Sequence, residues 1–67
     1  MKNNIKFLRR KMGLRQEDVA EKVDVTRQTI IAIENNKYNP TLELAIKLSR
    51  LFDKHVDEIF QLDDEIK

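Results

Sequence analysis

The sequence predicts an all-α domain built from five short helices. Three observations support this: the chain has only 67 residues, its apolar residues recur at helical spacing, and it contains one Gly and one Pro. A chain of this length buries about 60% of the surface that its unfolded form exposes, so the core is small. We therefore expect residues 1–67 to form a single domain.

The first helix is expected over residues 4–12. Ile5, Leu8 and Met12 are spaced i, i+3, i+7 and share one face, which we expect to point inward. Gly13 follows, and glycine readily adopts the left-handed backbone that ends a helix. The pattern therefore predicts a short first helix with a sharp end.

The second helix is expected over residues 16–23, with an inner face made of Val19, Ala20 and Val23. Asp24 and Val25 then form a tight connection. Thr26 is a suitable N-cap for a third helix over residues 27–35, because its hydroxyl can accept a hydrogen bond from an amide of the first turn. Asn36 is expected to end that helix in a left-handed conformation.

Residues 37–40 are expected to form a loop, after which Thr41 caps a fourth helix that runs to Phe52. Its inner face is Leu44, Ala45, Leu48 and Phe52, with Leu42 and Leu51 on either side. A fifth helix is expected over residues 56–60. The apolar residues alternate in residues 60–63, so a short C-terminal strand can form there.

Charge is distributed unevenly along the chain, although its net charge is only +1. Residues 1–50 hold eleven Lys and Arg against six Asp and Glu, a net charge of +5, and residues 51–67 carry −4. The first fifty residues can therefore face a phosphate backbone while the acidic end faces elsewhere. A solvated surface with chance asymmetry is the alternative.

Composition excludes several classes of function. The chain has no Cys and a single His, so we expect no disulfide, no metal site and no cofactor. No apolar run approaches the roughly 20 residues of a membrane span, and no signal peptide is recognisable, which predicts a cytoplasmic protein without a membrane partner. No nucleophile elbow or glycine-rich phosphate loop is present, so an enzyme is not expected.

The third helix has two distinct faces on a helical wheel. Ile30 and Ile33 share one side, and the opposite side carries Arg27, Gln28, Ile31, Ala32 and Asn35. Gln can form two hydrogen bonds to adenine, Arg can do the same to guanine, and small apolar side chains can contact the thymine methyl. The helix therefore suits a DNA major groove; an ordinary amphipathic surface helix is the alternative.

Residues 5–60 resemble the phage-repressor-like (Cro/XRE-type) helix-turn-helix transcriptional regulators, with the helix-turn-helix at residues 16–35. The resemblance rests on Leu8-Arg9, 16–20, 25–30, Ile33-Glu34, 37–42 and Leu44-Ala45. With Ile59-Phe60-Gln61, the chain is similar to the short cytolysin-repressor subgroup of bacterial repressors. The resemblance implies a homodimeric repressor that binds a near-palindromic operator in double-stranded DNA.

The resemblance also implies roles for individual residues. Base readout falls to Arg27, Gln28, Ile31 and Ala32. Phosphate contacts fall to Gln16, Thr26, Thr29, Asn36, Lys37 and Tyr38. An ion pair between Arg9 and Glu34 would be architectural, holding the recognition helix in place.

Three residues depart from the family pattern. Asp24 stands where glycine is usual in the turn, and Arg15 replaces the usual Ser or Thr cap of the second helix. Arg15 can either reach a phosphate or simply be solvated. Ala32 stands where some relatives carry a polar residue, which leaves hydrogen-bond readout to Arg27 and Gln28.

A C-terminal segment over about residues 52–66 is expected to form the dimer interface. Its apolar residues, Phe52, Ile59, Phe60, Leu62 and Ile66, exceed what so small a core can absorb. Closure of the monomer core by Ile59 and Phe60 is the alternative. A protein-binding, antitoxin-like module with weak DNA binding is the alternative function, and no small-molecule ligand is expected because the core leaves little room for a pocket.

Overall fold

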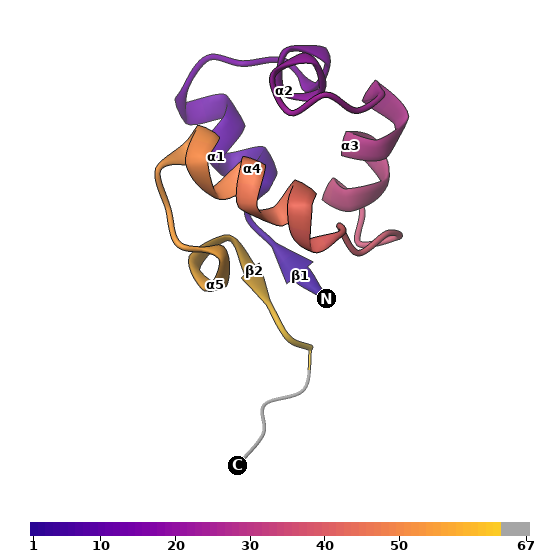
Figure 1. The fold of residues 1–67 in the computed structure, drawn as a ribbon, viewed down its shortest axis with the longest axis vertical. Coiled ribbons are helices and arrows are strands. Elements are labelled where there is room, and N and C mark those ends of the chain that lie inside the picture. Colours follow the sequence, from indigo (N-terminus) through magenta and orange to yellow (C-terminus); the bar gives the residue numbers. More distant parts are fainter. Residues whose placement is uncertain (64–67) are drawn as a thin grey trace.

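Five helices and one pair of short strands make up residues 1–63, the part of the chain that the computed structural model describes (Figure 1). In chain order they are β1 (Lys2–Asn3), α1 (Ile5–Lys11), α2 (Gln16–Lys22), α3 (Arg27–Glu34), α4 (Leu42–Phe52), α5 (Val56–Ile59) and β2 (Phe60–Gln61). The predicted five-helix fold is confirmed, and every helix boundary lies within one residue of the expected one.

Four of these helices end at a residue with left-handed backbone. These residues are Gly13 (φ 74°), Asp24 (φ 61°), Asn36 (φ 60°) and Asp53 (φ 55°). The left-handed ends predicted at Gly13 and Asn36 are confirmed, and Asp24 has the left-handed backbone that the usual glycine of the family pattern implies. Asp53 was not anticipated from the sequence. Only the first is a glycine, and Asp and Asn are the residues that tolerate this conformation best after it.

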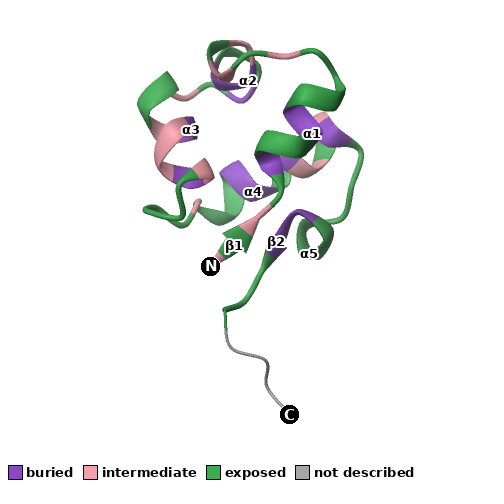
Figure 2. Cartoon of the chain, turned by 180° about the vertical axis from the view of Figure 1, so that it is seen from behind, coloured by how far each residue is buried: buried purple, intermediate pink, exposed green. Residues whose placement is uncertain are grey.

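The core is formed by the inward faces of the helices (Figure 2). Its most deeply buried side chains are Ile5, Val19, Val23, Ile30, Ile33, Leu48 and Ile59. The expected inner faces of α2 and α4 are confirmed. Met12 is a correction, since its side chain is 50% exposed. It is the C-cap of α1, where the chain already turns away from the core.

The two strands join the beginning of the chain to its end. β1 and β2 are antiparallel, with Lys2 opposite Gln61 and Asn3 opposite Phe60 (Figure 1). The short strand expected after α5 is therefore present; its partner at the N-terminus was not predicted. A strand of two residues carries too little pattern to be recognised in a sequence.

The apolar surplus on which the dimer segment was predicted needs correction, and the alternative stated for Ile59 and Phe60 is confirmed. Phe52, Ile59 and Phe60 are 6%, 0% and 7% exposed, because they close the core of a single chain. They are therefore not surplus apolar surface. Leu62 is 64% exposed, and Ile66 lies outside the described residues.

Within the described part of the chain, no helix is both long enough and apolar enough to cross a membrane. The same residues contain no cluster of three or more potential metal ligands of the His, Cys, Asp or Glu type.

Candidate nucleic-acid interface

The position of α3 is determined by the side that it buries. Ile30 and Ile33 are 0% and 1% exposed, and burial of each side chain contributes roughly 1.5–3 kcal/mol. The helix begins at Thr26, whose hydroxyl accepts a hydrogen bond from the Thr29 amide (3.3 Å). The predicted cap and the predicted inward face are both confirmed. The opposite face of α3 is left to solvent.

The turn between α2 and α3 fixes how the two helices meet. Asp24 N–H donates to the Glu21 carbonyl (3.3 Å) and Val25 N–H donates to the Ala20 carbonyl (2.9 Å). This pair of bonds is the Schellman arrangement, which requires a left-handed residue between the two helices. Asp24 supplies it in place of glycine. An aspartate therefore occupies the turn position where the family usually has glycine, and its left-handed backbone is less favourable than that of a glycine.

A buried ion pair attaches α3 to α1. Arg9 Nε lies 2.7 Å from Glu34 Oε2, and Arg9 Nη2 donates to Glu34 Oε1 (3.1 Å). The two side chains are 9% and 4% exposed. Arg9 Nη1 also donates to the Leu14 carbonyl (3.2 Å), and the Gln16 amide donates to Glu34 (3.1 Å). The architectural ion pair expected from the resemblance is confirmed.

Gln16, the first residue of α2, is held against the end of α3 by its hydrogen bond to Glu34. Its side-chain amide N–H is already bonded to Glu34, and the residue is half-buried. A carboxamide NH₂ group has two donors, so one N–H is left for another acceptor. The bond to Glu34 orients that second donor.

The outward face of α3 carries the residues expected to read bases. Arg27 and Gln28 are exposed in its first turn, whereas Ile31 and Ala32 are half-buried further along. Arg27 Nε lies 3.8 Å from Glu17 Oε1 at the start of α2. The guanidinium of Arg27 is thus turned toward the beginning of α2, which sequence reasoning did not foresee.

Arg15 and Asp18 begin α2 together. The Arg15 amide donates to Asp18 Oδ2 (2.8 Å), and Arg15 Nε donates to the same carboxylate (3.2 Å). Asp18 thus reaches back to the amide of the N-cap residue, which is the half of a capping box that the third helical residue supplies. The Arg15 side-chain and backbone hydrogen bonds hold the pKa of Asp18 below its ordinary value. The guanidinium of Arg15, 73% exposed, is also 3.4 Å from Glu17.

The far end of α3 is bonded to β1. Asn3 Nδ2 donates to the Ile33 carbonyl (2.8 Å) and to Asn36 Oδ1 (3.1 Å). Lys37 N–H closes the helix end on the Ala32 carbonyl (2.8 Å), and its side chain is exposed. Asn3 is a residue that sequence reasoning missed, because its partners lie about thirty positions away.

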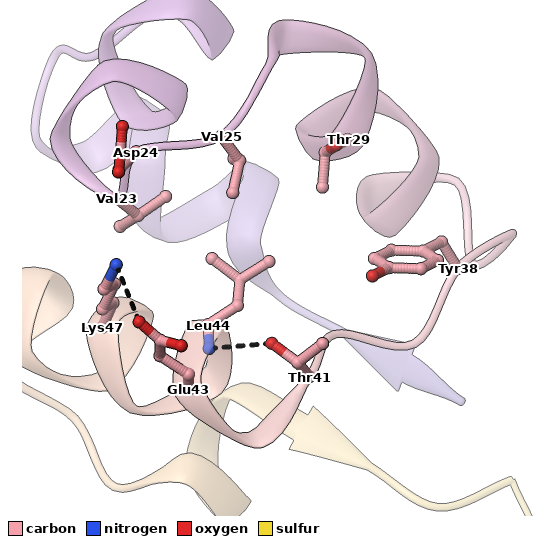
Figure 3. A pocket seen from close by; sticks show the side chains of 9 residues that line it. All are labelled: Val23, Asp24, Val25, Thr29, Tyr38, Thr41, Glu43, Leu44 and Lys47. Carbon is pink, nitrogen blue, oxygen red and sulfur yellow. Dashed lines mark hydrogen bonds and ion pairs between the residues drawn. The ribbon is translucent and has the colours of Figure 1, made fainter.

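Tyr38 borders an open hollow of about 290 Å³ between the turn and α4 (Figure 3). Val23, Val25 and Leu44 supply its apolar part, and an ion pair between Lys47 and Glu43 (3.3 Å) lies along its edge. Figure 3 shows the Tyr38 hydroxyl directed across the hollow. In this position the ring of Tyr38, 43% exposed, contributes an edge to the surface beside Lys37.

Most of the expected site residues thus lie on α3 or close to its two ends. Arg27, Gln28 and Thr26 lie at one end, and Asn36 and Lys37 at the other. Two residues join this surface unexpectedly, Glu17 and Asn3. The Arg15-to-Asp18 spacing of three residues is a pattern that could have revealed the reach-back cap in the sequence.

Comparison with known proteins finds a helix-turn-helix family model and several similar transcriptional regulators. A family model described as helix-turn-helix matches residues 5–59. An uncharacterized HTH-type transcriptional regulator of Methanocaldococcus jannaschii is 48% identical over 65 residues, covering 97% of this chain and 98% of the relative. Another from Archaeoglobus fulgidus is 45% identical, covering 97% and 93%. A third, from Bacillus subtilis, is 45% identical, covering 97% and 98%.

Proposed function

The chain belongs to the Cro/XRE-type helix-turn-helix family of transcriptional regulators, which are DNA-binding proteins and not enzymes, and on that premise we propose a specific role for it. The protein binds a near-palindromic operator in double-stranded DNA as a homodimer and represses transcription by occupying that operator in the cytoplasm. The observation that carries this proposal is the exposed pair Arg27 and Gln28 on a helix whose opposite face is buried.

Base readout is assigned to the outward face of α3. Arg27 and Gln28 enter the major groove first, where their side chains can each form two hydrogen bonds to a purine. Ile31 and Ala32 follow along the helix, and their half-buried apolar atoms can contact thymine methyl groups. The buried ion pair between Arg9 and Glu34 supports this role, because it holds α3 rigidly against α1.

Phosphate contacts are assigned to both ends of the recognition helix. Thr26 and Thr29 lie at the start of α3, and Asn36, Lys37 and Tyr38 lie beyond its end. Gln16 begins α2 and is bonded to Glu34, the last residue of α3. Contacts of this kind set the register of the protein on the duplex, and base contacts select the sequence. The second amide N–H of Gln16, oriented by Glu34, supports its assignment.

A homodimer would give the protein two half-sites spaced about 34 Å apart. The dimer surface must now be sought among side chains that the fold leaves exposed. From α4 to residue 63 the exposed large apolar residues are Leu42 (75%), Ile46 (40%), Val56 (37%) and Leu62 (64%). Sedimentation equilibrium of the full chain tests the proposed dimer.

Fluorescence anisotropy with a selected operator tests the function itself. A dimer making roughly 6–10 phosphate contacts should lose about 10³–10⁵ in affinity between 50 and 200 mM salt. Gln28→Ala should cost about 1–3 kcal/mol at one or two base pairs, whereas Lys37→Ala should weaken all sequences alike. Lys54→Ala, a cation outside the assigned surface, is the matched control for Lys37.

The assignment of Gln28 to base readout and of Lys37 to phosphate contact is wrong if the two alanine variants lose the same affinity on matched and on mismatched duplexes. Salt-independent, sequence-indifferent binding, together with a stable complex with another protein, would instead favour a protein-binding module.

A further inference from the structure

A basic groove of about 390 Å³ lies between α1 and the beginning of α2. Its polar lining consists chiefly of Lys6, Arg9, Arg10, Arg15, Gln16 and Arg27. Five of these six residues are cations. None of the roles assigned above uses Lys6 or Arg10.

The carboxylates near the groove neutralise only some of these cations. Arg9 is paired with the buried Glu34, so its charge is balanced at the base of the groove. Arg15 is paired with Asp18 (3.2 Å), and Arg15 and Arg27 also share Glu17, which lines the groove, at 3.4 and 3.8 Å.

Lys6 and Arg10 are the remaining cations. Both are exposed and form no ion pair within residues 1–63. They are spaced i, i+4 on α1, so their side chains project from the same face of that helix. The groove therefore carries a net positive charge concentrated along α1.

The position of the groove points to its ligand. It includes Gln16 and Arg27, which the proposed function places on the DNA, so it continues that surface beyond the beginning of α3. Duplex DNA carries one negative charge for about each 1.7 Å of its axis, so the surface beside a helix in the major groove meets phosphates. The guanidinium fork of Arg10 is well suited to a phosphate group.

We propose that this groove holds backbone phosphates that flank each half-site, with Lys6 Nζ and the Arg10 guanidinium donating to their oxygens. The inference rests on the proposed function and extends the DNA footprint from α3 to α1. Because the contacts are made to phosphate, they add affinity without selecting a sequence.

The test compares two double variants with the same loss of charge. Lys6→Gln with Arg10→Gln removes the proposed contacts, and Arg50→Gln with Lys54→Gln removes one Lys and one Arg that line a different hollow. All four side chains are exposed, so both variants should fold, which circular dichroism verifies. Binding is measured on long duplexes carrying a matched or a mismatched operator, over a range of salt concentrations.

The Lys6/Arg10 variant should lose about tenfold or more in affinity on both duplexes. The slope of log affinity against log salt should fall in magnitude by about one for each phosphate contact removed. Phosphate ethylation outside the half-sites should inhibit the wild-type protein but not this variant. The Arg50/Lys54 variant should keep wild-type affinity within about twofold.

Equal behaviour of the two double variants, in affinity and in salt slope, would overturn the inference while leaving the proposed function intact. Loss of affinity on the matched duplex alone would also overturn it, since phosphate contacts do not discriminate sequence. Absence of salt-dependent DNA binding by the wild-type protein is a separate outcome, and it would overturn the proposed function together with this inference.

Discussion

Removing one partner of the buried ion pair between Arg9 and Glu34 should cost a large part of the domain's stability. The two side chains are 9% and 4% exposed and lie 2.7 Å apart, so Arg9→Met leaves the Glu34 carboxylate buried without its countercharge. Breaking a pair of this kind costs about 3–5 kcal/mol. A domain of 67 residues has a free energy of unfolding of only about 3–10 kcal/mol.

Urea unfolding followed by circular dichroism measures this effect. With a slope of about 1 kcal/mol/M, a loss of 3 kcal/mol lowers the unfolding midpoint by about 3 M. The control is the double variant Arg9→Met with Glu34→Leu, which replaces both charges by apolar groups. It should recover most of the loss, because a buried ion pair and a well-packed apolar pair of similar volume differ little in stability.

Two results would refute this reasoning. A loss of less than about 1 kcal/mol in Arg9→Met would mean that water or a nearby cation compensates Glu34. The single variant Glu34→Leu completes the comparison. If the double variant loses as much free energy of unfolding as Arg9→Met and Glu34→Leu lose together, the two side chains contribute independently.

Three further predictions concern other positions. Glu17→Gln should tighten binding to matched and mismatched duplexes alike, because it removes a carboxylate that lies 3.8 Å from Arg27; unchanged or weaker binding in anisotropy titrations argues against this. Asp24→Gly should raise the thermal midpoint and Asp24→Val should lower stability by about 1–2 kcal/mol, because position 24 has φ 61°; equal midpoints would contradict the strain assigned to it. The Arg15 hydrogen bonds lower the pKa of Asp18 in the folded protein. The stability that these bonds add is complete when the pH is above 3.8, the ordinary pKa of the carboxyl group, and it is lost as the pH falls through the lower pKa of the folded state. Melting curves from pH 2 to 7 should show a smaller acid-side loss for Asp18→Asn, and parallel curves would show that the pair contributes nothing.

Local features of the sequence predicted most of the fold. The spacing of Ile30 and Ile33 identified the buried side of α3, and Thr26 marked its beginning, because periodicity and capping act within one or two turns. Asn36 was expected at a left-handed position for the same local reason, whereas the left-handed conformation of Asp24 was implied by the glycine usual at that position in the family. The ion pair of Arg9 with Glu34 is a long-range contact, and only resemblance to a family predicted it.

Long-range contacts without such a precedent were missed. β1 consists of two residues whose pairing with β2 spans almost the whole chain, and Asn3 bonds to the end of α3 some thirty residues away. The apolar count predicted surplus surface at Phe52, Ile59 and Phe60, whereas all three are buried, as the alternative of core closure expected for Ile59 and Phe60. Composition gives the amount of apolar material but not how much of it one core can bury.

The strand pair has a consequence for motion in the protein. It closes a loop of nearly sixty residues with two residues on each side, and such short pairings at chain ends are where fraying concentrates. Each fraying event that displaces Asn3 also releases its hydrogen bond to the Ile33 carbonyl, and with it the support at the end of α3. We therefore expect hydrogen exchange to be faster at the last amides of α3 than at its middle, so that opening of the paired termini loosens the helix assigned to the DNA.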